Sequence, residues 1–565
     1  MKREDEDTIH FSEQESRTCF ISTLHSSLFT LSMLSPESRA LAYKKEATME
    51  RNLTIYFTSD THGYFSPINY AAGVHADTGL ANCMASFRND GNVLVMDGGD
   101  TLQGSPFTYY LHKNGIVNPC VPAQVMNRAG YDFVTLGNHD FNYGPDHLRR
   151  YLRSVDARCL CANVSGLDGV TDIAVVTMEN GLRIGVTGIV THFVNVWEKP
   201  ENLAGITITE PIPAAKKALE TLRAENVDLT VCIYHGGFEN DLDTGAPLSE
   251  TGENQGYRIC RELGFDILLT GHQHIPMAGR RVFDTFTCQT PDKAKQYIRM
   301  EVTVSGAPID TAHRNQVAAG RVTARSFLED AGSVTDAEAA GILAPWEEAA
   351  AKWLDTPVGH LDTPLLPEEP IVMAEHGSCI ANFFNQVQLE ASGADISATS
   401  LGNEVKGLPQ EVTVRDVVAT YIYPNTLHTL EVDRAVLKQA LERSAEYFAI
   451  GENGLLQVSE SFLKPKVEHY NYDFFSGIEV TMDVRKPMGN RVISIRYQGQ
   501  ELSPDKTLTL CMNNYRSTGT GGYGCYLTCR KVKEQPTEIA EMIMDYIVSH
   551  GDIRVDRTKW LTVLH

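Results

Sequence analysis

Five short clusters of aspartate, asparagine, histidine and glycine recur along the first half of the chain. They are Asp60-Thr61-His62-Gly63, Asp97-Gly98-Gly99-Asp100, Gly137-Asn138-His139-Asp140, His235-Gly236-Gly237 and Gly271-His272-Gln273-His274. These side chains offer oxygen and nitrogen ligands and no thiolate, a set that suits divalent Mn, Zn, Fe or Co. Two ions need a shared ligand, and Asp100, central in the series, has a carboxylate whose two oxygens can bridge them. The clusters together predict a two-metal centre.

Each cluster taken alone has an ordinary structural interpretation. Asp60 can be a turn residue and His62 a surface residue, and Asn138 can cap a helix. A pair such as His272 and His274 can simply be exposed. The joint occurrence of all five clusters, each directly after an apolar run, favours the metal centre.

Those apolar runs are the elements that must position the clusters. They cover residues 53–58, 92–96, 133–136, 229–233 and 267–269. Continuous apolar runs are typical of buried parallel strands. A helical stretch such as 213–225 lies between two of them, which predicts α/β layering. Ligands of such sheets gather at the carboxyl ends of the strands, so we expect the clusters on one rim.

The order of the motifs DxH, GGDxxQGSP, GNHDFxYG, HGG and GHxH resembles the calcineurin-like metallophosphoesterases, in their 5′-nucleotidase-like branch. The resemblance implies a four-layer α/β metallophosphatase domain, two divalent ions and hydrolysis of phosphoric esters. It implies that one ion is held by Asp60, His62, Asp100 and His274, and the other by Asp100, Asn138, His235 and His272.

The same resemblance assigns the residues beside the substrate phosphate. His139 would stabilise the transition state or protonate the leaving group, and Asp140 would orient it. Many relatives carry an aspartate two residues after Asp140, where this chain has Asn142.

The second half is predicted to be a separate α/β domain. We expect a first domain over residues 49–335, a linker helix over 336–356 and a second domain over 357–565. Within the second domain we expect helices at 376–392 and 434–448 and a strand at 394–398.

Two aromatic segments of that domain could hold a nucleobase. They are residues 421–427 (YIYPNTL) and 513–524 (NNYRSTGTGGYG); the glycine-rich stretch is not a P-loop, and its ordinary interpretation is a flexible turn. With residues 469–477 they look like the bacterial bifunctional 2′,3′-cyclic-nucleotide 2′-phosphodiesterase/3′-nucleotidase subgroup. That likeness implies base stacking by Tyr423 and Tyr515, within a substrate-binding set of Asn138, Tyr423, Asn425, Tyr515, Gly521 and Gly522.

The likeness makes 2′,3′-cyclic nucleotides and 3′-nucleotides the expected substrates. Ordinary 5′-nucleotidases carry an arginine in a loop near the start of the second domain, whereas residues 400–404 of this chain (SLGNE) contain none. A 5′-nucleotidase or UDP-sugar hydrolase is the alternative activity. The alternative that is not an enzyme is a catalytically inert nucleotide-binding module.

Bulk properties limit the partners. The 565 residues exceed what one core usually organises, and the net charge of −23 argues against binding a nucleic-acid polymer. No run of 18 apolar residues exists, so we expect no membrane span. The 12 cysteines are scattered as in a protein with free thiols. Residues 1–48 look like a disordered extension without a credible signal peptide, which predicts a cytoplasmic protein although relatives are commonly exported.

Overall fold

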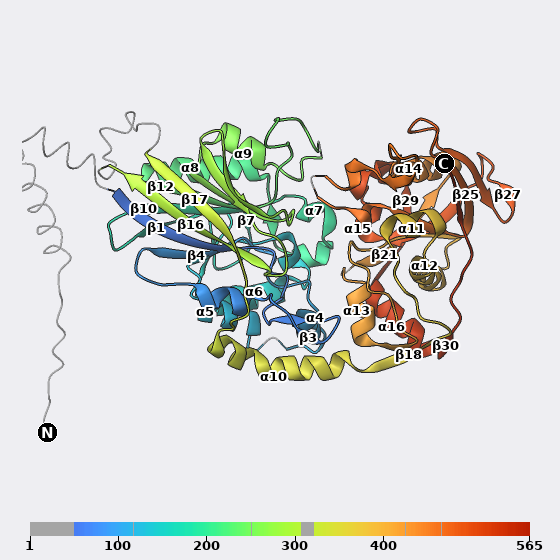
Figure 1. Cartoon of the computed structure of the whole chain (residues 1–565), viewed down its shortest axis with the longest axis horizontal. Helices are drawn as coiled ribbons and strands as arrows, with labels where there is room; N and C mark the ends of the chain where they lie inside the picture. The colour runs from blue at the N-terminus through green and yellow to red at the C-terminus, as the bar shows by residue number, and fades with distance from the viewer. Residues whose placement is uncertain (1–49, 117, 250, 307–320, 424, 465) are drawn as a thin grey trace, which may run out of the picture.

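A computed structural model describes residues 50–565 apart from residues 117, 250, 307–320, 424 and 465. The extension expected over residues 1–48 lies outside the described residues. Figure 1 shows two bodies side by side, with helix α10 (Ala337–Leu354) running along one edge of both.

Two sheets form the centre of the first body. The seven-stranded sheet has the order β17 (Val322–Asp330), β16 (Gln296–Ser305), β1 (Glu50–Thr58), β4 (Val93–Asp97), β5 (Phe133–Val134), β6 (Arg158–Leu160) and β8 (Val170–Thr171). The six-stranded sheet has the order β14 (Met277–Val282), β15 (Thr285–Gln289), β13 (Ile267–Thr270), β12 (Leu229–His235), β10 (Arg183–Val190) and β9 (Ile173–Thr177). Strands β1, β4, β5 and β6 are parallel to one another, and so are β10, β12, β13 and β15.

The side-chain alternation of β1 explains how the layers stack. Ile55 and Phe57 point into a core that they share with Val231 and Leu269 of the other sheet, whereas Tyr56 points to the opposite face. Successive side chains of a strand face opposite sides, so one strand serves two cores. The outer faces are covered by α4 (Pro106–Lys113), α5 (Val121–Ala129) and α6 (Pro145–Ser154) on one side and by α8 (Pro211–Ala224) and α9 (Gly256–Glu262) on the other. The predicted four-layer α/β architecture is confirmed.

The second body is also α/β. Its central sheet has the order β24 (Asp473–Ser476), β19 (Ile396–Ser400), β28 (Leu508–Asn513), β21 (Thr426–Val432) and β29 (Arg530–Glu538). A four-stranded sheet contains β27 (Gln500–Glu501), β26 (Val492–Tyr497), β25 (Ile478–Asp483) and β31 (Leu561–Leu564), and a three-stranded sheet contains β20 (Glu411–Thr413), β18 (Pro357–Leu361) and β30 (Asp552–Ile553). The helices are α11 (Pro370–His376), α12 (Cys379–Ser392), α13 (Val414–Thr420), α14 (Arg434–Ala445) and α16 (Ile539–His550).

The helix expected over residues 376–392 begins later than predicted. The backbone breaks at Gly377, whose φ is 88° and which ends α11. Ser378 then caps α12, its hydroxyl accepting the N–H of Ala381. A serine cap directly after a glycine in this conformation separates two helices.

Helix α10 is held at both ends. Asp336, its N-cap, pairs with Arg128 of α5 at 2.7 Å. Beyond its last turn, Arg415 of α13 binds Asp355 at 2.7 Å and donates to the backbone carbonyl of Tyr70 at 2.6 Å. These contacts tie the linker helix to both bodies. Within the described ranges, no helix is long and apolar enough to cross a membrane.

Candidate two-metal active site

The five clusters lie at the carboxyl ends of strands β1, β4, β5, β12 and β13. Because these strands run parallel within each sheet, the clusters come together at one rim, as the strand pattern predicts. Two groups of possible metal ligands form there, Asp60 with His62 and His274, and Asp100 with His235 and His272.

The backbone at this rim is unusual. Five of the possible ligands have φ between 50° and 69°, a range that residues other than glycine rarely adopt: Asp60, His62, Asp100, His272 and His274. Such conformations cost about 1–3 kcal/mol each and cluster at functional sites. The fold therefore maintains a backbone that turns these side chains toward one another.

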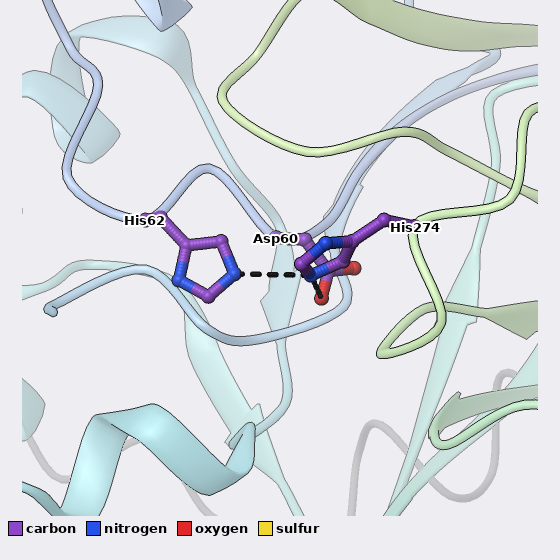
Figure 2. A group of neighbouring side chains, drawn as sticks. All are labelled: Asp60, His62 and His274. Carbon is purple, nitrogen blue, oxygen red and sulfur yellow. Dashed lines mark hydrogen bonds and ion pairs between the residues drawn. The ribbon is translucent and has the colours of Figure 1, made fainter. Parts of the chain in front are cut away.

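In the first group, nitrogen and oxygen acceptors face each other. Nε2 of His62 lies 3.1 Å from Nε2 of His274, which lies 3.3 Å from Oδ1 of Asp60 (Figure 2). Nδ1 of His62 is 2.9 Å from the carbonyl oxygen of Gln103, so the ring proton is on Nδ1. Nε2 of His62 therefore turns a lone pair toward the other two side chains.

The second group is arranged in the same way. Nδ1 of His235 donates to the carbonyl of Gly98 at 2.7 Å, so that its Nε2 turns a lone pair toward Oδ2 of Asp100 and Oδ1 of Asn138, both at 3.2 Å. Nε2 of His272 donates to Oε1 of Glu253 at 2.8 Å, and its Nδ1 lies 2.9 Å from the same oxygen of Asn138.

When the imidazoles are neutral, acceptor atoms converge here, which is the arrangement that a divalent cation satisfies. The charges agree. Burial alone would raise the pKa of Asp100, but the nearby imidazoles, His235 first, hold it well below the usual range. Burial alone would lower the pKa of His235, but the carboxylates of Asp100 and Asp60 raise it to about 10. Cation binding would take the place of the proton that His235 otherwise holds.

Asp100 faces both groups through one oxygen. Its Oδ2 lies 3.2 Å from Nε2 of His235 and 3.8 Å from Nε2 of His62. Its Oδ1 accepts the backbone N–H of His139 at 2.7 Å. Oδ2 is therefore the oxygen of Asp100 that lies nearest to ligand atoms of both groups.

His139 lines the same cleft, but Asp140 does not orient it, and that expectation is wrong. The carboxylate of Asp140 accepts backbone N–H groups of Gly137, Asp100, Thr101 and Leu102 at 2.8–3.0 Å. Nδ1 of His139 lies 2.8 Å from Oδ1 of Asn142. His139 and Asp140 belong to a 3₁₀ turn over Asn138–Phe141 with Asn142 as its C-cap, and side chains three positions apart in such a turn lie on the same side. Asn142, three residues after His139, thus reaches the ring.

Asp140 has a structural task instead. Burial raises its pKa to about 6, with the nearby charge of Asp100 adding to the shift. Its four N–H partners lie in the two loops that carry Asp100 and Asn138. The carboxylate therefore joins these loops.

A cleft of about 790 Å³ extends from this rim to the second body. Every residue predicted to bind substrate lines it: Asn138, Tyr423, Asn425, Tyr515, Gly521 and Gly522. Tyr470 lies edge-on to Tyr423 with ring centroids 6.4 Å apart. Residues Ser400, Asn403 and Glu404 also line the cleft, from the loop that contains no arginine.

Trp197 joins the rim to the second body. Helices α7 (Val194–Trp197) and α15 (Asn514–Ser517) lie where the two bodies meet (Figure 1). The Trp197 ring stacks on His272 with centroids 5.5 Å apart and lies 6.4 Å from the Tyr515 ring. One aromatic side chain thus contacts both a predicted metal ligand and a predicted base-stacking residue.

Residues 53–276 match the calcineurin-like phosphoesterase family, and residues 357–548 match the 5′-nucleotidase C-terminal domain. A solved Staphylococcus aureus protein assigned as a 5′-nucleotidase is 30% identical, with a TM-score of 0.82 over 91% of this chain and all of that one. The chain belongs to the 5′-nucleotidase family of calcineurin-like phosphoesterases.

Two further relatives of this phosphoesterase share less of its sequence. A 2′,3′-cyclic-nucleotide 2′-phosphodiesterase/3′-nucleotidase from Haemophilus influenzae is 23% identical over 88% of this chain and 84% of its own length. A trifunctional nucleotide phosphoesterase from Bacillus subtilis is 24% identical over 90% of this chain, which spans 39% of that protein.

Three residues of the phosphoesterase site were not predicted from the sequence: Trp197, Glu198 and Glu253. All three lie outside the five motifs: Trp197 ends the short helix α7, Glu198 follows it, and Glu253 lies in the loop between β12 and α9. No strand pattern or ligand spacing precedes them, so only the tertiary structure brings them to the site.

Proposed function

We propose that this phosphoesterase hydrolyses phosphoric esters of nucleotides, with 2′,3′-cyclic nucleotides and 3′-nucleotides as its substrates. The observation that carries the proposal is the shared cleft: the two ligand groups lie at one end of it, and tyrosines of the second body line the same space. The Haemophilus influenzae relative bears the name of this activity.

We further propose that Asp60, His62, Asp100 and His274 hold one divalent ion and that Asp100, Asn138, His235 and His272 hold a second. When bound, such a pair supplies charge neutralisation at a phosphoryl group and acidifies water. Gly98, Gln103 and Glu253 accept the outer ring protons and thereby fix the orientation of the three imidazoles that contact them.

His139 acts on the phosphate. Its ring lies edge-on to His62, with centroids 5.2 Å apart, and it lines the cleft beside the ligand groups. From there a ring protonated on both nitrogens can donate from Nε2 to a phosphoryl or leaving oxygen while its Nδ1 donates to Oδ1 of Asn142.

Tyr423 and Tyr515 hold the base. Both rings are partly exposed where they line the cleft, which leaves an aromatic face for stacking. Holding the base keeps the ester in attack geometry, so that binding energy contributes to the rate. We propose that residues 49–335 form the metal-binding domain, residues 336–356 the linker helix and residues 357–565 the nucleotide-binding domain.

The alternative activity is that of a 5′-nucleotidase or a UDP-sugar hydrolase, and the likeness to the Staphylococcus aureus protein favours the former. Against it, the loop from Ser400 to Glu404 brings no guanidinium to the cleft. Arg443 lines the cleft but is bound by the carbonyl of Gly521 at 2.8 Å and by Glu446 at 2.7 Å. A catalytically inert binding module would not need all seven of the proposed metal ligands.

The deciding experiment compares four substrates with metal-free protein to which Mn²⁺, Zn²⁺ or Co²⁺ is added. We expect 2′,3′-cyclic AMP and 3′-AMP to be hydrolysed faster than 5′-AMP and a UDP-sugar. Faster hydrolysis of 5′-AMP would establish the alternative, and no hydrolysis of any ester with any ion would establish the binding module.

A further inference from the structure

The amide of Asn142 connects His139 to a carboxylate that lies farther along the chain. Oδ1 of Asn142 lies 2.8 Å from Nδ1 of His139. Nδ2 of the same amide lies 2.5 Å from Oε2 of Glu198. A chain of two hydrogen bonds thus runs from the imidazole through a neutral amide to a carboxylate.

Glu198 is itself fixed. Its other oxygen, Oε1, accepts the backbone N–H of Lys199 at 2.7 Å and Nδ2 of Asn202 at 2.9 Å. Nδ2 of Asn202 also donates to the backbone carbonyl of Asn142 at 2.9 Å. The loop from Glu198 to Asn202 therefore holds the Asn142 side chain and backbone together.

The direction of these bonds follows from what each group can donate. A carboxylate accepts hydrogen bonds only, so the Asn142 atom that faces Glu198 must be the NH₂ group. The amide oxygen then faces His139, and an oxygen acceptor requires a proton on Nδ1 of the ring. The carboxylate of Glu198 in this way determines the tautomer of an imidazole that it does not touch.

We propose that Glu198 and Asn142 form a positioning pair: the amide oxygen keeps a proton on Nδ1 of His139, so that a second proton on Nε2 makes the ring a donor aimed at the substrate phosphate. This inference rests on the proposed phosphoesterase activity. It assigns Glu198 a role that neither metal binding nor base stacking requires.

Glu198→Gln tests the pair by changing one acceptor into a donor. The new side-chain amide must keep its oxygen toward Lys199 and Asn202, so it presents NH₂ to Asn142 and turns the Asn142 amide over. The NH₂ group of Asn142 then faces Nδ1 of His139 and displaces its proton. We expect kcat for p-nitrophenyl phosphate to fall by about 10²-fold, the lower end of what a positioned proton-transfer group contributes.

Asn142→Asp provides the rescue. Alone, it places two carboxylates in contact that share one proton, and residue 142 still offers Nδ1 of His139 an accepting oxygen, so we expect kcat within about tenfold of the wild type. Combined with Glu198→Gln, the new carboxylate accepts both from Nδ1 of His139 and from the new amide NH₂ at position 198. The double variant should therefore recover kcat to within about tenfold of the wild type, although Glu198→Gln alone costs about 10²-fold.

Matched controls separate this role from a structural one. Glu201→Gln changes an exposed carboxylate in the same loop and should keep wild-type kcat. Asn142→Leu removes the amide without adding charge and should lose as much activity as Glu198→Gln. Bound Mn²⁺ per chain and the thermal midpoint should be the same in all five variants and the wild type.

Each outcome bears on a different claim. Wild-type protein that hydrolyses no phosphate ester would overturn the proposed function and this inference together. Active wild type with an unimpaired Glu198→Gln variant, or a double variant no more active than Glu198→Gln, would overturn the positioning pair alone. Loss of Mn²⁺ or of the folded state from Glu198→Gln and Asn142→Leu would also overturn it, because the pair would then support the site as a whole.

Discussion

The backbone N–H of His139 donates to Oδ1 of Asp100 at 2.7 Å, which leaves Oδ2 of Asp100 to face both ligand groups. The carboxylate proposed to bridge the ions is thus oriented by the main chain of the residue proposed to act on the phosphate. Removing the side chain of His139 leaves this hydrogen bond in place, whereas removing the carboxylate of Asp100 breaks it.

Asp100→Ala should therefore abolish turnover and remove more than one equivalent of metal. Oδ2 of Asp100 lies 3.2 Å from Nε2 of His235 in one group and 3.8 Å from Nε2 of His62 in the other, so its loss should weaken both sites at once. Metal content of the purified variant, measured by mass spectrometry, tests this. Two ions still bound per chain would show that Asp100 does not bridge.

His139→Ala should keep its metal and lose activity. We expect kcat to fall by about two or more orders of magnitude, as for loss of a charge-stabilising or proton-donating group. The measurement is kcat beside metal content on the same sample. A variant that loses metal together with activity would place His139 among the ligands.

Glu253→Gln should weaken the ion at His272. Oε1 of Glu253 accepts from Nε2 of His272 at 2.8 Å, which keeps Nδ1 free to face Asn138. Loss of such a partner typically costs about 10–100-fold in metal affinity. Chelator competition should show one of the two ions bound more weakly and the other unchanged. Equal loss of affinity for both ions, or no loss for either, would contradict the assignment of Glu253 as a partner of the ligand His272.

The convergence of the five clusters could be predicted because the signal is local. An apolar run predicts a buried strand, and parallel strands deliver the residues after their last positions to the same rim. All five predicted runs form strands, although β5 is only Phe133–Val134. The long strands β10 and β16 were not predicted: β10 (RIGVTGIV) contains two glycines, which weaken a strand pattern.

The orientation of the site residues was less predictable. Asp140 is next to His139 in the sequence, yet a 3₁₀ turn directs it to the loop backbones and brings Asn142 to the ring. The positive φ of Asp60 and His62 has no signature in local propensity, since only the surrounding fold maintains it. Trp197, at the end of the four-residue helix α7, and Glu253, in a loop, are brought to the site by tertiary packing.

The base-binding role of the tyrosines gives the last prediction. Tyr423→Ala or Tyr515→Ala should raise KM for 3′-AMP and 2′,3′-cyclic AMP by about 10–100-fold, from ~1–3 kcal/mol of lost stacking. Because stacking serves any base, adenine, guanine, cytosine and uracil nucleotides should be affected alike. Hydrolysis of p-nitrophenyl phosphate should hardly change, since that ester has no base to hold. Equal losses on both kinds of substrate would mean instead that the tyrosines, which contact Tyr470 and Trp197, support the closure of the two bodies and bind no base.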